Sequence, residues 1–256
     1  SRIQQRSLDR AATVDMSTVV AATVQPEFVL TEASASNTLP GNDNGTSTNP
    51  QNRGDCRRGG EGWVEYGDLD SAHGNRATGV EACLDSAYIT NHPGTRTQPS
   101  QGITPAGYAW ARDYVSYLGG KRSGVNACHL LGAQLGGSGT LLANLATCGT
   151  DANSYVGKPN QPIPPMDSMN HFEDEVRSLI DSGRVVQYQV IPHYRGERNV
   201  PYEFHMSYQA WAKNGQILIA DSTTVSNLIY TAKSGWKNLG TAIHSESGHN
   251  VPTPTQ

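Results

Sequence analysis

Apolar and polar positions alternate in three stretches toward the C-terminal end of the chain. Residues 184–194, 200–212 and 215–224 read RVVQYQVIPHY, VPYEFHMSYQAWA and GQILIADSTT. Alternation with a period of two is typical of a strand that buries one face. Because short connections separate the three stretches, they predict an antiparallel meander.

An earlier pair of segments predicts a β-hairpin. Residues 62–67 (GWVEYG) and 76–84 (RATGVEACL) are rich in β-branched and aromatic side chains, and a polar turn segment separates them. Folding this hairpin about its turn returns Cys83 to the neighbourhood of Cys56. We therefore expect a disulfide between these two cysteines.

Two segments carry apolar residues at helical spacing. They are residues 104–120, TPAGYAWARDYVSYLGG, and residues 167–183, DSMNHFEDEVRSLIDSG. The first stops at a Gly-Gly pair, and the second begins with Asp167 or Ser168 as its cap. Both are expected to be amphipathic helices that flank the sheet.

A Cys-His pair precedes a glycine-rich turn in residues 126–139, NACHLLGAQLGGSG. With Gly137-Ser138 as the bend, a β-turn-β element brings Cys128 opposite Cys148. These cysteines are therefore expected to form a second disulfide. The polar segment GTDANSY follows as a turn or helix start.

The chain divides unevenly. Residues 1–52 include a Ser/Thr/Asn/Pro/Gly-rich tract that buries too little apolar surface to fold alone, so they are expected to be an arm or linker, with a strand-prone part at 16–32. Residues 53–245 form the expected folded domain, and residues 246–256 form a tail. The predicted fold class is α+β, with a central antiparallel sheet and flanking helices.

Composition limits the compartment and the partners. The four cysteines form no C-x-x-C pair, which favours disulfides over zinc binding, and the charged fraction is only 16%. We therefore expect a secreted protein. The net charge of −4 argues against a uniformly basic coat for nucleic acid. No segment approaches the roughly 20 apolar residues of a membrane helix, so no membrane partner is expected. The oligomeric state is left open.

Four positions in order resemble a known nuclease family. They are His129, Asn144 in ANLATCGTDAN, Asn153, and the glutamate of the helix MNHFEDEVRSL, Glu173. This order resembles the DNA/RNA non-specific endonucleases of the ββα-metal, or His-Me finger, superfamily, over residues 61–230. The resemblance implies a ββα-metal catalytic element, with DNA and RNA as substrates and 5′-phosphate products. An inhibitor protein is a further candidate partner.

The chemistry of phosphodiester hydrolysis suits these residues. A neutral imidazole has a pKa of about 6.5 and can deprotonate water near neutral pH, so His129 is the expected general base. Mg²⁺, or alternatively Mn²⁺, would be held by the amide of Asn153, and Glu173 would hold its waters. Arg177, one turn after Glu173, would contact a phosphate oxygen. Asn144 would either orient the site or contact phosphate.

One departure from the family pattern concerns an arginine. The family reads Asp-Arg-Gly before the histidine, whereas this chain has Asn126, Ala127 and Cys128. A replacement cation is therefore required for full activity. The candidates by charge are Lys121, Arg122, Arg57 and Arg58.

Other interpretations remain open at this stage. A lone histidine is more often structural than catalytic, and a Glu–Arg pair on a helix is an ordinary surface ion pair. A Cys128 nucleophile is disfavoured because adjacent strand residues point to opposite faces. A secreted module that binds nucleic acid or glycans without cleaving them is the alternative function. The remaining histidines show no short ligand spacing and are interpreted as structural: His73, His92, His193, His205, His244 and His249. Asn170 and His171 lie close to Glu173 in the same predicted helix, and they are the residues with which the aligned positions could be confused.

Overall fold

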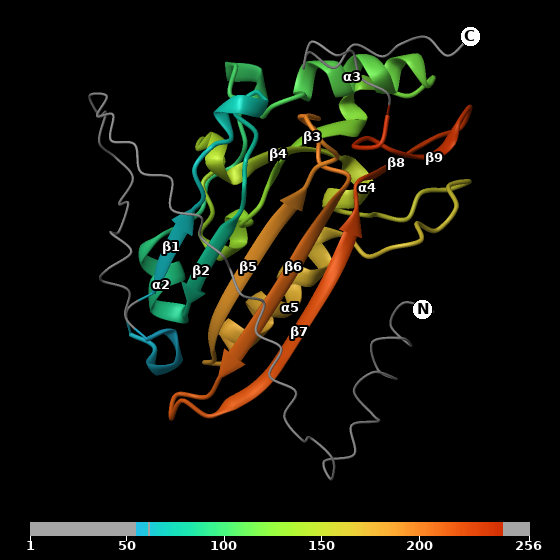
Figure 1. The fold of residues 1–256 in the computed structure, drawn as a ribbon. Coiled ribbons are helices and arrows are strands. Elements are labelled where there is room, and N and C mark those ends of the chain that lie inside the picture. Colours follow the sequence, from blue (N-terminus) through green and yellow to red (C-terminus); the bar gives the residue numbers. More distant parts are fainter. Residues whose placement is uncertain (1–54, 61, 243–256) are drawn as a thin grey trace. The chain divides into compact units, whose positions relative to one another are not determined.

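A five-stranded antiparallel sheet is the centre of the computed structural model, which describes residues 55–60 and 62–242. Its strands lie in the order β1-β2-β5-β6-β7 (Figure 1). Their bounds are Trp63–Tyr66, Val80–Leu84, Val185–His193, Glu203–Trp211 and Ile217–Ser226. The predicted hairpin (β1, β2), the predicted meander (β5, β6, β7) and the α+β class are confirmed.

Helix α5, Met169–Asp181, covers one face of this sheet. Phe172 on the helix contacts Tyr188 of β5 and Tyr208 of β6, with ring centroids 6.4 and 5.3 Å apart. Along β5 and β6 the even-numbered residues are buried on this side, and the odd-numbered ones between them are more exposed. Of the two proposed caps, Ser168 is the one that accepts a hydrogen bond, from the amide of His171 at 3.4 Å.

A second layer holds the ββα unit. Strands β3 (Val125–His129) and β4 (Leu145–Gly149) pair antiparallel, and α4 (Thr150–Asn153) follows directly. Helix α3 (Tyr108–Tyr117) lies over β3 and buries Trp110, Ala111 and Val115 against a separate apolar cluster. Three short elements were not predicted from the sequence: α2 (Ser86–Asn91), β8 (Leu228–Thr231) and β9 (Gly235–Asn238).

Both predicted disulfides are present, with Cα–Cα distances of 5.6 Å for Cys56–Cys83 and 5.9 Å for Cys128–Cys148. The expectation that Cys128 lies directly opposite Cys148 is wrong. Cys128 pairs with Ala146, and Cys148 with Asn126, so the disulfide is diagonal. The reason is that the connection between the strands is a long loop with two 3-10 turns, not a tight bend, and these turns set the register.

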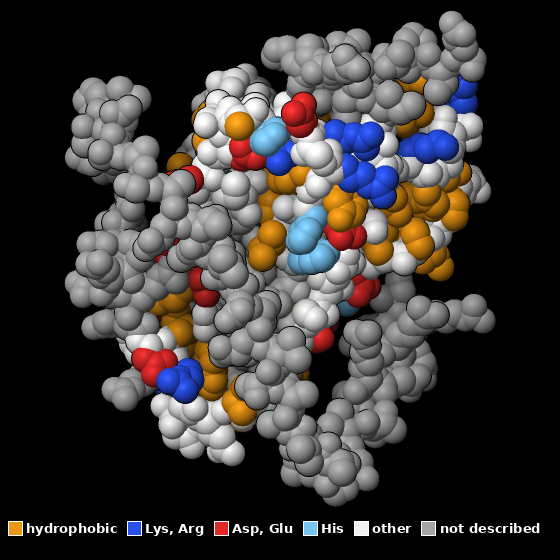
Figure 2. Space-filling view, in the orientation of Figure 1, with side chains coloured by type: hydrophobic (Ala, Val, Ile, Leu, Met, Phe, Trp, Pro, Cys, Tyr) orange, Lys and Arg blue, Asp and Glu red, His pale blue; other side chains and the backbone are white. Residues whose placement is uncertain are grey.

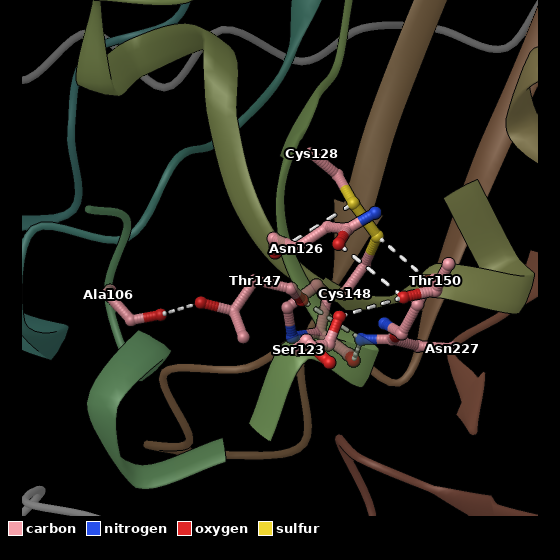
Figure 3. The surroundings of a disulfide bond; sticks show 10 residues. Ala106, Ser123, Asn126, Cys128, Thr147, Cys148, Thr150 and Asn227 are labelled. Carbon is pink, nitrogen blue, oxygen red and sulfur yellow. Dashed lines mark hydrogen bonds between the residues drawn. A yellow bond between two sulfur atoms is a disulfide. The ribbon is translucent and has the colours of Figure 1, made fainter. Parts of the chain in front are cut away.

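Side chains around the second disulfide fix the hairpin to the rest of the fold (Figure 3). The amide of Asn227 donates to the carbonyls of Thr147 and Pro201 and accepts from the amide of Gly149, at 3.1, 2.8 and 2.9 Å. The hydroxyl of Thr147 donates to the carbonyl of Ala106 at 2.8 Å. Strand β4 is therefore tied both to the start of β6 and to the segment before α3.

Some predictions fall on residues that the structure does not describe. These are the domain boundaries at 52/53 and 245/246, the strand-prone part at 16–32, the tail at 246–256, and His244 and His249. They stay predictions. Among the described residues, none of the helices has the length and apolar character to cross a lipid bilayer.

Candidate active site

His129 is the last residue of β3, and a main-chain carbonyl sets its tautomer. Its Nε2 lies 2.8 Å from the carbonyl oxygen of Thr95. A carbonyl oxygen can only accept a hydrogen bond, so Nε2 carries the hydrogen and Nδ1 keeps its lone pair. Burial lowers the pKa of His129 below its usual 6.5, and the bond to Thr95 opposes this only partly. The ring is therefore neutral at pH 7, with Nδ1 available as a base.

The segment that carries Thr95 is attached to the glycine-rich turn. The amide of Thr95 donates to the carbonyl of Gly137 at 3.0 Å, and its hydroxyl accepts from the amide of Gly139 at 2.8 Å. A Cβ on Gly139 would lie 2.2 Å from the main chain of Arg96, so only glycine permits this approach. The turn thus positions the carbonyl that orients His129.

Asn144 is fully buried and bonds only to main-chain atoms of this loop. Its Oδ1 accepts from the amide of Leu131 at 2.8 Å, and its Nδ2 donates to the carbonyls of Leu131 and Ser138 at 3.0 and 2.9 Å. Of the two roles considered for Asn144, its position supports the orienting one. A phosphate contact would require an exposed amide.

Glu173 lies on the buried face of α5, pressed against the same loop. It is 6% exposed, and a Cβ on Gly132 would lie 2.0 Å from its Oε2. Burial raises the pKa of Glu173 to about 8, against hydrogen bonds from Gln134 and the amide of Gly132, while the negative charge of Asp174 raises it further. No cationic side chain is among the groups that shift the pKa of Glu173. An ionised Glu173 is therefore a buried charge that a divalent cation would stabilise.

Arg177 ties the end of α5 to the loop. Its guanidinium donates to Asp181 at 2.9 Å and to the carbonyl of Gln134 at 2.7 Å. The side chain is 38% exposed. These bonds fix its orientation and leave part of the guanidinium open to solvent.

Asn153 ends α4, and its side chain is partly buried. This short helix packs against β3, β4 and α5. The element that carries Asn153 therefore touches both the strand of His129 and the helix of Glu173. An amide oxygen and a carboxylate are ligands that suit Mg²⁺, so the donor set fits this cation.

The four residues proposed to replace the family arginine stand on segments other than the end of β3 that carries His129. Lys121 and Arg122 precede β3, which is about 13 Å long at the usual rise per residue, and Arg122 pairs with Asp113. Arg57 and Arg58 belong to the 3-10 helix beside the first disulfide. Arg57 pairs with Asp55 at 3.0 Å.

Arg96 is the cation that sequence reasoning missed. It follows Thr95 directly, and its side chain is exposed. Within the described residues, no carboxylate pairs with it. No periodicity marks the segment GTRTQ, so only the contact between this segment and the turn reveals the residue's place near His129.

Comparison with known proteins decides the family. A family profile described as DNA/RNA non-specific endonuclease matches residues 52–212, more than half of the chain. The chain belongs to this family. The family consists of hydrolases, and nucleic acids are their substrates. No curated protein sequence matches the chain.

Three solved structures are similar to this endonuclease at low identity. NucA from Streptococcus agalactiae without metal is 18% identical over 72% of this chain and 81% of its own, with a TM-score of 0.47. With a magnesium ion bound, it is 18% identical over 70% and 80%, with a TM-score of 0.45. Sda1 nuclease with a bound zinc ion is 17% identical over 67% and 78%, with a TM-score of 0.48.

The position of the family arginine is covered in this endonuclease. Ala127 is 5% exposed and pairs with Thr147, whose hydroxyl is bonded to the carbonyl of Ala106. Cys128, at the family's glycine, is in the core disulfide. A long cationic side chain at position 127 would therefore collide with packed atoms. The fold around Ala127 does not accommodate the arginine that the family has at this position.

Proposed function

We propose that this endonuclease is a secreted, Mg²⁺-dependent enzyme that hydrolyses both DNA and RNA to 5′-phosphate ends. The observation that carries the proposal is the tautomer of His129. Its Nε2 is engaged by the carbonyl of Thr95 at 2.8 Å, so Nδ1 is the basic atom. A neutral base of this kind is what the attack of water on a phosphodiester requires near neutral pH.

In the proposed reaction, Nδ1 of His129 accepts a proton from the attacking water. The water oxygen forms a bond to phosphorus, and the bond from phosphorus to the 3′ oxygen breaks. The 3′ oxygen leaves with the electron pair of the broken bond and takes a proton from a surrounding water, so the products are a 5′-phosphate and a 3′-hydroxyl. The bond from Nε2 to Thr95 keeps the ring oriented while its charge changes, because that bond is available to both the neutral and the protonated ring.

Asn153 and Glu173 are the proposed holders of the metal. The amide of Asn153 would ligate it directly, and the carboxylate of Glu173 would hold its waters, as the buried position of that carboxylate supports. When bound, Mg²⁺ neutralises charge on the phosphate and on the leaving oxygen.

Arg96 is the proposed replacement for the missing family arginine. Its neighbour in the chain supplies the carbonyl that orients His129, and its own side chain is exposed and unpaired within the described residues. A phosphate brought to His129 therefore lies within reach of a flexible guanidinium. Arg177 offers a second, more rigid contact.

Secretion is supported by the two disulfides. All four cysteines of the chain are paired. Disulfides persist in oxidising compartments and are rare where cytosolic thiols keep cysteines reduced.

The test is cleavage of plasmid DNA and of RNA by the purified protein, with Mg²⁺ or with EDTA. We expect cleavage that EDTA abolishes, and we expect His129→Ala to lower kcat by about 10² to 10⁴ while DNA binding is retained. His171→Ala is the matched control, because His171 is an exposed histidine on α5 paired with Asp167. Full activity in His129→Ala, or binding without cleavage in the parent, would contradict the proposal and favour a binding module.

A further inference from the structure

Two histidines and a glutamate meet on the sheet, away from the residues described above. His193 ends β5, and it pairs across the strands with Glu203, the first residue of β6. His205 lies two residues further along β6, diagonal to His193. The imidazole rings are stacked with centroids 3.7 Å apart, and Nε2 of His205 lies 2.7 Å from Oε1 of Glu203.

The sequence predicts a structural role for both histidines, because no short spacing joins them. The antiparallel register of β5 and β6 brings the two histidines together. Their separation in the sequence therefore does not reveal that their side chains are neighbours. One potential ligand atom from each of His193, Glu203 and His205 lies within 4.8 Å of the others.

This cluster faces away from α5. On β5 and β6 the buried residues that pack toward α5 are even-numbered, such as Tyr188 and Phe204. His193, Glu203 and His205 are odd-numbered, and side chains alternate between the two faces of a strand. The sheet therefore separates the cluster from Glu173.

We propose that His193, Glu203 and His205 form a binding site for a divalent transition-metal ion of the zinc class, distinct from the proposed catalytic Mg²⁺ site. Imidazole nitrogens and a carboxylate oxygen are ordinary ligands for such an ion, and three protein ligands leave a fourth position for water. Mg²⁺ is disfavoured here because it prefers oxygen ligands.

The geometry is close to what the ion needs. Metal–ligand bonds of 2.0–2.2 Å in a tetrahedral site place the ligand atoms about 3.3 Å apart. The three atoms must therefore approach one another modestly from their present limit of 4.8 Å. Side-chain rotation allows this, since His205 and Glu203 are 44% and 22% exposed while their main chains are fixed in the sheet.

The surroundings leave room for the ion and its water. Figure 2 shows histidine side chains gathered on the face of the molecule that displays the sheet in Figure 1. A hollow of about 140 Å³ opens beside His205, lined also by Gln189, Ser207 and Thr224. An ion here would link the end of β5 to the start of β6 and stabilise that end of the sheet by mass action.

The test is titration of the purified protein with Co²⁺ as a probe for Zn²⁺, with Mg²⁺ in excess to occupy the catalytic centre. We expect one bound equivalent, visible-region absorption typical of imidazole–carboxylate ligation, and a higher thermal midpoint with Zn²⁺. His193→Ala and His205→Ala should each weaken binding at least about tenfold, and Glu203→Gln should weaken it as well.

The matched control is His73→Ala. His73 is also a partly exposed histidine bonded to a carboxylate, Asp70, at 2.7 Å, but among the described residues it belongs to no group of three potential metal ligands. Its removal should leave Co²⁺ binding unchanged. His129→Ala should likewise leave it unchanged, which makes the result independent of the proposed nuclease activity.

Three outcomes would overturn the proposal. They are the absence of Co²⁺ binding in the folded parent protein, unchanged binding in a His193→Ala, His205→Ala double variant, and loss of binding in His129→Ala alone. The last would assign the ion to the catalytic centre. Circular dichroism of each variant establishes that it is folded.

Discussion

Glu173 is a single buried carboxyl whose charge the fold does not compensate. Its pKa in the folded protein is about 8, against 4.5 for an ordinary glutamate. Between these values the unfolded chain has released its proton while the folded protein keeps it. The free energy of unfolding therefore falls as pH rises from about 4.5 to 8 in the absence of metal.

Replacing Glu173 by Gln should remove this dependence, because glutamine keeps a carbonyl acceptor and never ionises. In EDTA we expect Glu173→Gln to be more stable than the parent at pH 8, by up to a few kcal/mol, and nearly equal to it at pH 5. Urea unfolding at the two pH values measures the difference. An equal or lower stability of the variant at pH 8 would contradict the raised pKa.

Arg96 is the residue by which the proposed phosphate contact is tested. Arg96→Ala should lower kcat/KM by about 10- to 10³-fold, because it removes the charge that is proposed to contact the reacting phosphate. Arg96→Lys should restore part of the loss. Arg122 is the informative comparison, since it is already paired with Asp113 at the far end of β3. A larger loss in Arg122→Ala than in Arg96→Ala would return the role to Arg122, one of the four cations proposed from the sequence.

The proposed catalytic histidine and its helix partners were within reach of sequence reasoning, but the contacts that orient the histidine were not. His129, Asn153 and Glu173 stand in a recognisable order, and their elements do touch in the fold. Thr95 and Arg96 carry no such signal, because a main-chain carbonyl works with any side chain attached to it. The structural role of Asn144 also depends on burial, which its neighbours in sequence do not reveal.

At the scale of elements, the loop between β3 and β4 behaves as a single unit held by Asn144. Removing that side chain leaves the amide and carbonyl of Leu131 and the carbonyl of Ser138 without their partner. We expect Asn144→Ala to lower the free energy of unfolding by about 1 to 3 kcal/mol or more. It should also lower kcat, because the loop positions His129 and contacts Glu173.

Asn227 provides a matched control for this prediction. It is equally buried and also makes three bonds to main-chain atoms, but these hold β4 to Pro201 and not the catalytic loop. Asn227→Ala should cost similar stability and leave kcat close to the parental value under conditions where both variants are folded. Equal losses of kcat in the two variants would assign the effect to stability alone.

Periodicity predicted the elements better than their registers. The alternation in β5 and β6 and the apolar stripe of α5 were sufficient to place them, since the sheet and the helix bury one face against each other. Strand β7 is exposed over most of its length and buries no continuous face. The diagonal disulfide was not predictable, because the register of β3 and β4 depends on the 3-10 turns of their loop. Strands β8 and β9, of four residues each, were not predicted.

At the scale of the whole molecule, two disulfides close loops of similar length in different places. Their sequence separations are 27 and 20 residues, so in the chain-entropy model each contributes about 3 kcal/mol. The double variant Cys56→Ser, Cys83→Ser should therefore lose stability but keep its kcat. Cys128→Ser, Cys148→Ser should lose similar stability and part of its kcat, because Cys128 adjoins His129.

Thermal unfolding and plasmid cleavage measure the two effects. Mass spectrometry of a non-reduced digest should show Cys56 linked to Cys83 and Cys128 linked to Cys148. Thiol-blocking reagents should leave the native protein active. Inhibition of the unreduced protein by alkylation would instead revive the cysteine nucleophile.

The hydrogen bond from His129 to the carbonyl of Thr95 affects which mutations near residue 95 the protein tolerates. Every amino acid supplies a carbonyl, so point substitutions at position 95 cannot delete the acceptor that fixes the tautomer of the base. Insertions and deletions are different, because they shift the chain path between Gly94 and Arg96 relative to the turn. The acceptor for the proposed base therefore survives a substitution at position 95, whereas a substitution at Gly139 or a change in the length of this segment would displace it.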